Sequence, residues 1–546
     1  MHKIFEIFDK YKEHLILLIY LLTLYLSREI CLLMFNSLDS PDFEKYFEYI
    51  RYFYSESEET ELSQGSLYYT LQSWGLYFYS DLIGEDNFIG LLNKSIQNVN
   101  LVLFLISQIG FYNLLRYFKF NKNSILLTLS LLNFFPLTIA LRISMKTEIL
   151  VLSFLPWLIL YIEIFLKTKK YIYLYMSIPL LSIILLSKGS SLAIVGLFVL
   201  IVYINKIKLI EKKQFIVLSI FLIVISSLIY TEDSNINNND LLSPSHEEKY
   251  DNTAPFSVIY KLEIKNLVKT PFKNNLSNSF IGITLLDTFG DYFELYWNND
   301  ASNFFKNRKQ LIVYNSENTK ILPTYNSQLK QITVYSSTSD PNYANSGDFL
   351  RDSFSWILTL LFYLLLFKLF RKKAQYKKYL IAPFVGMLVL LFTSISGFPV
   401  NNYDPMVSDT YKAFYYSYMV VFAFIFVFSE LFDGSFFKKL YFVPILLIFL
   451  FILGFPKVHS NEFDDKVVQM NTYSELCEVN DFLLKTLDYP DTDCSEQIKI
   501  TDKSETKIIG SDLKKPRLNI INLLNAFLTI FMFGYYFYNR KKIFNE

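Results

Sequence analysis

Residues 14–34 read HLILLIYLLTLYLSREICLLM, and residues 35–46 continue FNSLDSPDFEKY. The first run is almost wholly apolar and matches the roughly 20 residues that cross the ~30 Å hydrocarbon core of a bilayer. No small-residue cleavage pattern follows it, which predicts a retained span rather than a cleaved signal. The second run is acidic, and Pro41 stiffens its turn. We therefore expect Asp39 and Asp42 to lie at the membrane surface, directly beyond the first span.

The rest of the chain repeats this alternation of apolar runs and polar loops. Hydrophobic residues make up 52% and charged residues 19% of the 546 residues, and the mean hydropathy is +0.27. These values indicate an all-α polytopic membrane protein with about twelve transmembrane helices. The predicted spans are 15–34, 98–118, 124–141, 149–166, 171–187, 190–204, 214–230, 354–370, 379–396, 413–431, 440–455 and 519–538.

Basic residues cluster in alternate loops, for example at 116–122, 206–213 and 371–378. The positive-inside rule assigns these loops and both termini to the cytoplasm. The same rule places 35–97, 231–353, 397–412 and 456–517 outside. The basic clusters flank spans, so anchoring explains them and no nucleic-acid partner is indicated.

The loop lengths predict five parts. They are an N-terminal transmembrane module 1–230 with the acidic loop 35–97, an extracytoplasmic loop 231–353, a second transmembrane group 354–455, an extracytoplasmic segment 456–517, and a final span with its tail, 518–546. In loop 35–97, apolar and aromatic residues at helical spacing predict amphipathic helices over 42–54 and 65–79.

The three cysteines differ in their predicted surroundings. Cys31 lies within the first span and is expected to be a core residue. Cys477 and Cys494 share the outside segment 456–517. In an oxidising compartment these two could form a disulfide, while their spacing does not resemble a zinc site.

Three short motifs follow one another along the chain. Pro41-Asp42 is followed by Tyr46, the run 142–148 (RISMKTE) falls in the second predicted outside loop, and Lys188-Gly189 follows a later span. In order and layout they resemble the motifs of GT-C glycosyltransferases. The closer likeness is to bacterial relatives of protein O-mannosyltransferases (glycosyltransferase family 39) and of the lipid A aminoarabinose transferase. The likeness covers most of the chain, but does not explain 287–297 or 456–517.

The resemblance implies a GT-C-like helical bundle in the cell (inner) membrane. Such an enzyme moves a sugar from a polyprenyl-phosphate donor to a glycan, lipid or protein acceptor on the extracytoplasmic face. The acceptor loses a proton as it attacks the anomeric carbon, and a carboxylate within hydrogen-bond reach can take that proton. Asp42 is the first candidate for this base and Asp39 the second, in an inverting single displacement.

The leaving group in that reaction is a lipid phosphate, whose developing charge needs cations or a metal. Arg142, Lys146 and Lys188 lie at predicted outer span ends, against the prevailing sign of the outside loops. Together with Tyr46 they are the candidate ligands of the donor's phosphate and sugar. Snorkelling toward lipid headgroups is the structural alternative for each cation.

Glu148 begins a predicted span and has two interpretations. It could join Asp42 as a second carboxylate on a divalent metal such as Mg²⁺ or Mn²⁺. Alternatively, Arg142 or Lys146 could pair with it, because an unpaired carboxylate at a span end is costly. The sequence contains no strict metal signature.

Two other function classes fit the layout less well. An O-antigen polymerase or ligase also has about a dozen spans, but relies on Arg and His in late loops. The supply of Arg in 231–353 is poor, with only Arg308 and Arg351. A lipid-linked sugar flippase or transporter would use broken helices rich in Gly and Pro. This chain has 16 of each, and its predicted spans are nearly free of charge.

Overall fold

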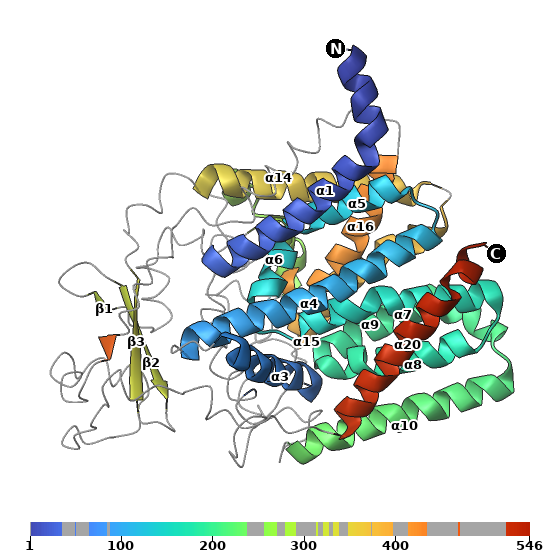
Figure 1. The fold of residues 1–546 in the computed structure, drawn as a ribbon. Helices are drawn as coiled ribbons and strands as arrows, with labels where there is room; N and C mark the ends of the chain where they lie inside the picture. The colour runs from blue at the N-terminus through green and yellow to red at the C-terminus, as the bar shows by residue number, and fades with distance from the viewer. Residues whose placement is uncertain are drawn as a thin grey trace.

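We analysed a computed structural model of the chain (Figure 1). It describes residues 2–34, 50, 65–83, 88–236, 256–269, 279–290, 313–314, 320–326, 331–337, 348–372, 374–396, 413–433, 468–469 and 520–545.

Helices dominate the described residues, and most of the longer ones lie side by side in one bundle (Figure 1). The N-terminal helices are α1 (His2–Met34), α3 (Ser66–Ile83), α4 (Phe88–Tyr117), α5 (Lys122–Leu132), α6 (Pro136–Ile143), α7 (Glu148–Thr168), α8 (Ile172–Ser187), α9 (Gly189–Tyr203), η2 (Ile204–Leu209) and α10 (Lys212–Ile236). The later helices are η4 (Phe256–Ile259), α11 (Ile264–Lys269), α12 (Phe280–Asp287), α14 (Asp348–Phe370), η7 (Gln375–Ile381), α15 (Ala382–Ser396), η9 (Ala413–Tyr416), α16 (Ser417–Asp433) and α20 (Ile520–Asn545).

By length and composition, six helices among the described residues could cross a membrane, or seven if a bent pair counts as one span. This supports membrane association, while the prediction of about twelve spans is not confirmed. The predicted span 171–187 forms the shorter α8, and 214–230 and 519–538 coincide with α10 and α20, which are not among the six. The predicted span 440–455 lies outside the described residues.

The bent pair is α5 and α6, whose axes differ by 60°. Pro136 is the first residue of α6 and has no N–H to continue the hydrogen-bond ladder of α5. The preceding Phe135 is extended, at φ −68° and ψ 125°, as the residue before a proline prefers. The predicted single span 124–141 is therefore two short helices.

The central helix is α7. In its most apolar window 89% of the residues are buried, against 22% in α1. It packs on α4 and α8, and α20 covers it around Trp157 and Tyr161. The Tyr161 hydroxyl donates to the Met532 carbonyl at 3.1 Å. The ring centres of Trp157 and Phe533 lie 4.5 Å apart. Figure 1 shows α20 running along this part of the bundle.

Polar side chains fasten the peripheral α1 to the bundle. The Tyr20 hydroxyl donates to Gln108 Oε1 (2.5 Å), Gln108 Nε2 donates to Asn133 Oδ1 (2.6 Å), and Asn133 Nδ2 donates to Thr23 Oγ1 (2.9 Å). In apolar surroundings each of these groups needs a partner, so the chain of bonds fixes α1 against α4 and α5.

A small antiparallel sheet lies beside the bundle (Figure 1), and the all-α prediction did not include it. Its order is β1 (Val313–Tyr314), β2 (Lys320–Asn326), β3 (Gln331–Ser337) and β4 (Val468–Gln469). The β3 sequence QITVYSS is rich in β-branched residues, which favour a pleated strand. Because Val334 pairs with Val468, the two long segments 231–353 and 456–517 meet in one sheet.

The contact between α4 and α7 gives a test of the packing. A Cβ added to Gly110 would lie 2.8 Å from Pro156 Cγ and 2.8 Å from Trp157 Nε1. We expect Gly110→Ala to lower the free energy of unfolding by about 1–3 kcal/mol through overpacking. Gly534 of α20 has open space around its Cα, so Gly534→Ala should instead be neutral or stabilise by about 0.4–1 kcal/mol. Thermal unfolding in detergent compares the two, and a loss of similar size in both would contradict the close approach of α4 and α7.

Candidate functional site

Two strongly polar clusters lie at opposite ends of α7, around Glu148 at its first residue and around Glu163 near its last turn. We call these the Glu148 end and the Glu163 end of the bundle. The Glu148 end also receives the last turn of α1, the end of α6, the junction of α8 with α9, and the start of α16.

The turn between α6 and α7 is held by one side chain of α4. Ser144 leaves α6 in an extended conformation, at φ −95° and ψ 151°. Asn100 Nδ2 donates to the carbonyls of Ser144 (2.8 Å) and Arg142 (3.1 Å). These are carbonyls that the end of a helix leaves without an intrahelical partner. Asn100 therefore fixes the path of the chain between Arg142 and Glu148.

The amphipathic helix α3 braces Asn100 from the other side. The hydroxyl of Tyr68 (3.1 Å) and Nε2 of Gln72 (2.9 Å) both donate to Asn100 Oδ1. Burial raises the pKa of the Tyr68 phenol well above its ordinary value, so it stays a neutral donor. This helix matches the predicted helix 65–79 in position, but many of its side chains are buried rather than at a surface. The predicted helix 42–54 falls, apart from Ile50, outside the described residues.

Glu148 and Lys188 form a buried ion pair at the head of α7. Lys188 Nζ lies 2.7 Å from Glu148 Oε1, with side-chain exposures of 16% and 0%. Lys188 Nζ also lies 4.9 Å from the centre of the Tyr415 ring, beside α16. The amino terminus of α7 adds a favourable field for the carboxylate. Within the described part of the chain, Glu148 Oε2 accepts no hydrogen bond, so one buried oxygen is open to a further partner.

Both flanks of the acidic loop are fastened at this end. On one side Arg142 Nη1 donates to Ser27 Oγ of α1 at 2.8 Å. On the other side the Gly65 N–H donates to the Ser187 carbonyl at 3.0 Å, directly before Lys188. Between them, Ser73 Oγ donates to the carbonyl of Ile50. The loop therefore starts beside Arg142 and returns beside Lys188.

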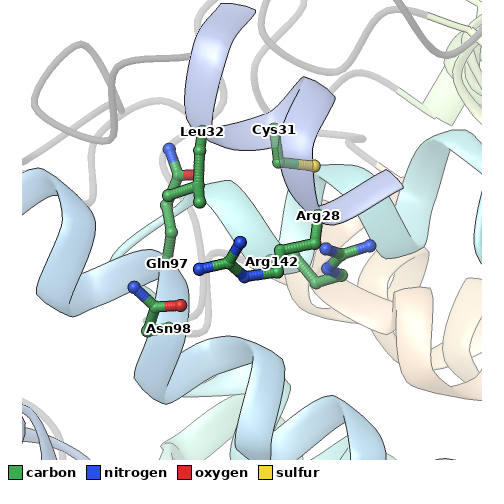
Figure 2. Close-up of a pocket in the computed structure, with 6 residues that line it drawn as sticks. All are labelled: Arg28, Cys31, Leu32, Gln97, Asn98 and Arg142. Atoms are coloured by element: carbon green, nitrogen blue, oxygen red, sulfur yellow. The ribbon is translucent and has the colours of Figure 1, made fainter. Parts of the chain in front are cut away.

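Arg142 points away from Glu148, toward α1 and α4. It is 2% exposed, its guanidinium lies 5.4 Å from the centre of the Phe104 ring, and it lines a narrow crevice (Figure 2). The other residues lining this crevice are Arg28, Cys31, Leu32, Gln97 and Asn98. Arg142 or Lys146 was the predicted partner of Glu148. The ion pair in the structure is formed with Lys188 instead. Lys146 is buried in the α6–α7 turn.

The remaining predicted site residues lie outside the described residues. They are Asp39, Asp42, Tyr46, Cys477 and Cys494. Of the predicted set, the structure thus brings Glu148 and Lys188 into contact and places Arg142 and Lys146 in the adjoining turn. Among the described residues, no three His, Cys, Asp or Glu side chains gather as a metal site would require. Cys31 is buried and carries a free thiol, in line with its prediction as a core residue.

Sequence reasoning missed Asn100, Tyr68 and Tyr415. Asn100 did carry a signal, because an amide within an apolar run has to find a partner when it is buried. Tyr68 and Tyr415 carried none, since the chain has 41 tyrosines and nothing local separates these two from the others.

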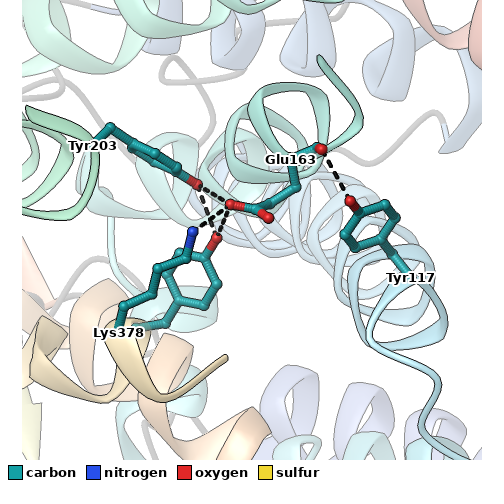
Figure 3. Close-up of polar contacts among 5 residues, drawn as sticks. Tyr117, Glu163, Tyr203 and Lys378 are labelled. Atoms are coloured by element: carbon teal, nitrogen blue, oxygen red, sulfur yellow. Dashed lines mark hydrogen bonds and ion pairs between the residues drawn. The ribbon is translucent and has the colours of Figure 1, made fainter. Parts of the chain in front are cut away.

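Glu163 forms the second cluster, and its Oε1 has three donors where Glu148 Oε1 has one (Figure 3). Its Oε1 accepts from Lys378 Nζ (2.6 Å), the Tyr379 hydroxyl (2.5 Å) and the Tyr203 hydroxyl (3.1 Å). The Tyr117 hydroxyl donates to the Glu163 carbonyl at 2.9 Å. The cluster joins α7 to α4, α9 and η7, so its evident role is to hold these helices together.

Removing the cation of this second cluster should destabilise the protein. Lys378→Met leaves the largely buried Glu163 carboxylate with two tyrosine donors only, and we expect a loss of about 2 kcal/mol. Lys372→Met is the matched control: it breaks the pair with Glu430 at the same end, where the lysine side chain is 52% exposed. That loss should stay below about 1 kcal/mol. Thermal unfolding in detergent measures both, and equal losses would show that the Glu163 cluster is no more important than a surface pair.

A second test concerns Asn100. Asn100→Leu deprives the carbonyls of Arg142 and Ser144 of their donor and should cost about 2–3 kcal/mol. Asn113→Leu, on the same helix, removes only a bond to the Ile109 carbonyl one turn away and should cost clearly less. If the Asn113 variant unfolds at the same or a lower temperature, Asn100 does not hold the α6–α7 turn.

Comparison with known proteins identifies no family. No family model and no curated protein matches the chain. Two solved structures show a distant likeness, both of the Archaeoglobus fulgidus oligosaccharyltransferase. One is its complex with Zn and sulfate (14% identity, TM-score 0.33, covering 88% of this chain and 59% of that one). The other is tethered by a disulfide to an acceptor peptide containing the NVT sequon (12% identity, TM-score 0.35, covering 91% and 61%).

The chain spans about three fifths of the length of these two structures. At TM-scores this low the likeness establishes neither a shared fold nor an activity. The functional argument therefore depends on the site itself.

Proposed function

We propose that this chain is a GT-C-type membrane glycosyltransferase that transfers a sugar from a polyprenyl-phosphate donor to an envelope acceptor. The Glu148 end would face the extracytoplasmic side, with both termini in the cytoplasm. The observation that carries this proposal is the buried Glu148–Lys188 pair, whose carboxylate keeps one oxygen open.

The position of the pair supports this assignment. Leaving one oxygen of a buried carboxylate without a donor is costly, so a further partner for it is expected. The Glu148 side chain is fully buried, whereas that of Glu163 is 11% exposed. Glu148 Oε2, which has no hydrogen-bond partner among the described residues, lies at the end of the bundle where the flanks of the acidic loop also meet.

The length of the acidic loop allows Asp42 to belong to the same site as Glu148 and Lys188. Asp42 follows the end of α1 at Met34 by eight residues, and an extended chain spans at most about 3.3–3.6 Å per residue. Asp42 is therefore within about 29 Å of Met34, in a loop that returns to Gly65 beside Ser187. We propose Asp42 as the base that takes the proton of the acceptor hydroxyl, with Asp39 as the alternative and Tyr46 as a contact of the sugar.

The cations would serve the leaving group. As the bond from the sugar to the phosphate breaks, negative charge grows on the phosphate oxygens, and fixed positive groups stabilise that charge. Lys188 and Lys146 lie at the head of α7, and Arg142 lies on the other face of the same turn. Glu148 would orient Lys188, and its open oxygen would accept a hydrogen bond from a hydroxyl of the sugar.

A divalent metal is not needed for these steps. Glu148 is the only carboxylate of the described cluster, and Lys188 already engages one of its oxygens. Mg²⁺ or Mn²⁺ is usually held by several oxygen ligands, so a metal here would require Asp39 or Asp42.

The proposal is tested by the transfer of radiolabelled sugar from polyprenyl-phosphate donors, with purified protein in lipid. Asp42→Asn removes the proposed base and should lower the rate about 10²–10⁴-fold. Glu148→Gln, which leaves Lys188 without its counter-charge, should lower the rate by at least about tenfold. The control Glu211→Gln changes an exposed carboxylate in the loop before α10 and should leave the rate unchanged.

Three outcomes are informative. Loss of transfer in both site variants, with unchanged unfolding temperatures, would support the enzyme and its site. Transfer that survives Asp42→Asn but fails in Asp39→Asn would move the base to Asp39. The absence of transfer with every donor tested, from a folded wild-type protein, would contradict the glycosyltransferase assignment.

A further inference from the structure

Seven exposed lysines lie on two turns at the Glu163 end of the bundle. One turn joins α7 to α8, and the other leads from α9 through η2 into the start of α10. The lysines are Lys167, Lys169, Lys170, Lys206, Lys208, Lys212 and Lys213. The sequence of these two turns, 167–171 and 204–213, contains one acidic residue, Glu211, so positive charge dominates both.

A hydrogen bond joins the two turns. The Glu211 N–H donates to the Tyr171 hydroxyl at 3.2 Å. Lys170 directly precedes Tyr171 and Lys212 directly follows Glu211, so this bond holds lysine-bearing backbone of both turns close together. The helices α8 and α10, which begin at these turns, pack against each other in the bundle (Figure 1). We call residues 167–171 and 204–213 together the Tyr171 corner.

The Tyr171 corner lies where membrane-spanning helices end. Two candidate spans, Glu148–Thr168 and Gly189–Leu209, end in its two turns. Lysines that close a span lie at the depth of the phospholipid headgroups, where their ammonium groups meet phosphate. Next to them in the sequence, Ile172 of α8 and Phe215 and Ile216 of α10 are 37%, 45% and 57% exposed. The corner therefore offers cations together with an apolar surface, and a lipid with an anionic headgroup complements both.

We propose that the Tyr171 corner binds a phospholipid with two phosphates, a diphosphatidylglycerol (cardiolipin), and that this lipid fastens α8 to α10. The lysines of each turn would contact one phosphate, and the acyl chains would lie against the exposed apolar side chains of α8 and α10. A lysine ammonium carries three donors on a flexible stem, so it follows phosphate oxygens without a fixed geometry. Basic clusters between helices at the cytoplasmic side of a membrane suit such headgroups. A nucleic acid would leave the apolar surface without a partner.

This lipid site is distinct from the proposed site of sugar transfer. It lies at the Glu163 end of α7, whereas the Glu148–Lys188 pair lies at the other end. Lipid binding is therefore measured without a sugar donor or an acceptor, and its outcome is independent of whether the protein transfers sugar. Because a lipid that bridges the two turns binds only the folded protein, it should raise the unfolding temperature.

Cardiolipin titrated into the purified full-length protein in a neutral detergent tests the proposal. Native mass spectrometry measures the bound lipid, and thermal unfolding measures the stabilisation. Lys170→Gln/Lys212→Gln should weaken cardiolipin binding about tenfold or more, because it removes one cation from each turn. The matched control Lys119→Gln/Lys122→Gln removes the same charge from exposed lysines of the turn between α4 and α5, at the same end of the bundle, and should leave the affinity unchanged.

A further variant keeps every charge. Tyr171→Phe removes the hydroxyl that joins the turns and should weaken cardiolipin binding severalfold, while the ring can still pack on Phe165. Phosphatidylglycerol, which has one phosphate, should bind at least about tenfold more weakly than cardiolipin at equal phosphate concentration, because it cannot engage both turns at once. Equal affinity for the two lipids, or equal loss of cardiolipin binding in both lysine double variants, would overturn the proposal, since general attraction to positive charge would then account for the binding.

Discussion

The burial of α7 along nearly its whole length is the constraint on which the rest of the structure depends. A helix enclosed on all sides can present polar groups only where other helices meet them, and α7 has glutamates at both ends. At each end, helices from distant parts of the sequence converge on that carboxylate. The turn between α6 and α7, the junction of α8 with α9 and the position of η7 can all be understood as consequences of this requirement.

The two glutamates show how similar chemistry can serve different purposes. Glu163 gathers a lysine and two tyrosines on one oxygen and links α7 to α9 and η7. Glu148 gathers one lysine, and its other oxygen has no hydrogen-bond partner among the described residues. A buried polar group without a partner needs an explanation, and contact with a substrate is one such explanation.

Much of the helical architecture was predictable, because a run of apolar residues of bilayer length has few alternatives to a helix. The spans around α1, α4, α7, α9, α14 and α15 were predicted from such runs, and the helix α3 from its helical spacing of apolar residues. The break at Phe135 was missed, although Pro136 is the signal that produces it. The sheet was missed because its strands are short and its fourth strand comes from a distant segment. No local sequence pattern therefore predicts the pairing of β3 with β4.

The candidate site was predictable only in part. Charged residues at span ends singled out Arg142, Lys146, Glu148 and Lys188, because charge is rare there. The packing of α7 against α8 and α9 decides which of them pair, and no local sequence motif predicts this packing. The engaged Glu163 was overlooked because one carboxylate in an apolar helix is easily read as a surface residue. Its partners Lys378 and Tyr379 come from more than 200 positions away in the chain.

The contact between α7 and α20 has a consequence for biogenesis. Tyr161 and Met532 are 371 positions apart, and Trp157 packs against Phe533 and Tyr536 of the same distant helix. During synthesis α7 leaves the ribosome long before α20 does. Until then the Trp157 face of α7 lacks the helix that covers it, and this part of the core forms only after α20 arrives. A ribosome that stalls before α20 would thus release a bundle whose central helix is open on one side, a natural target for membrane quality control.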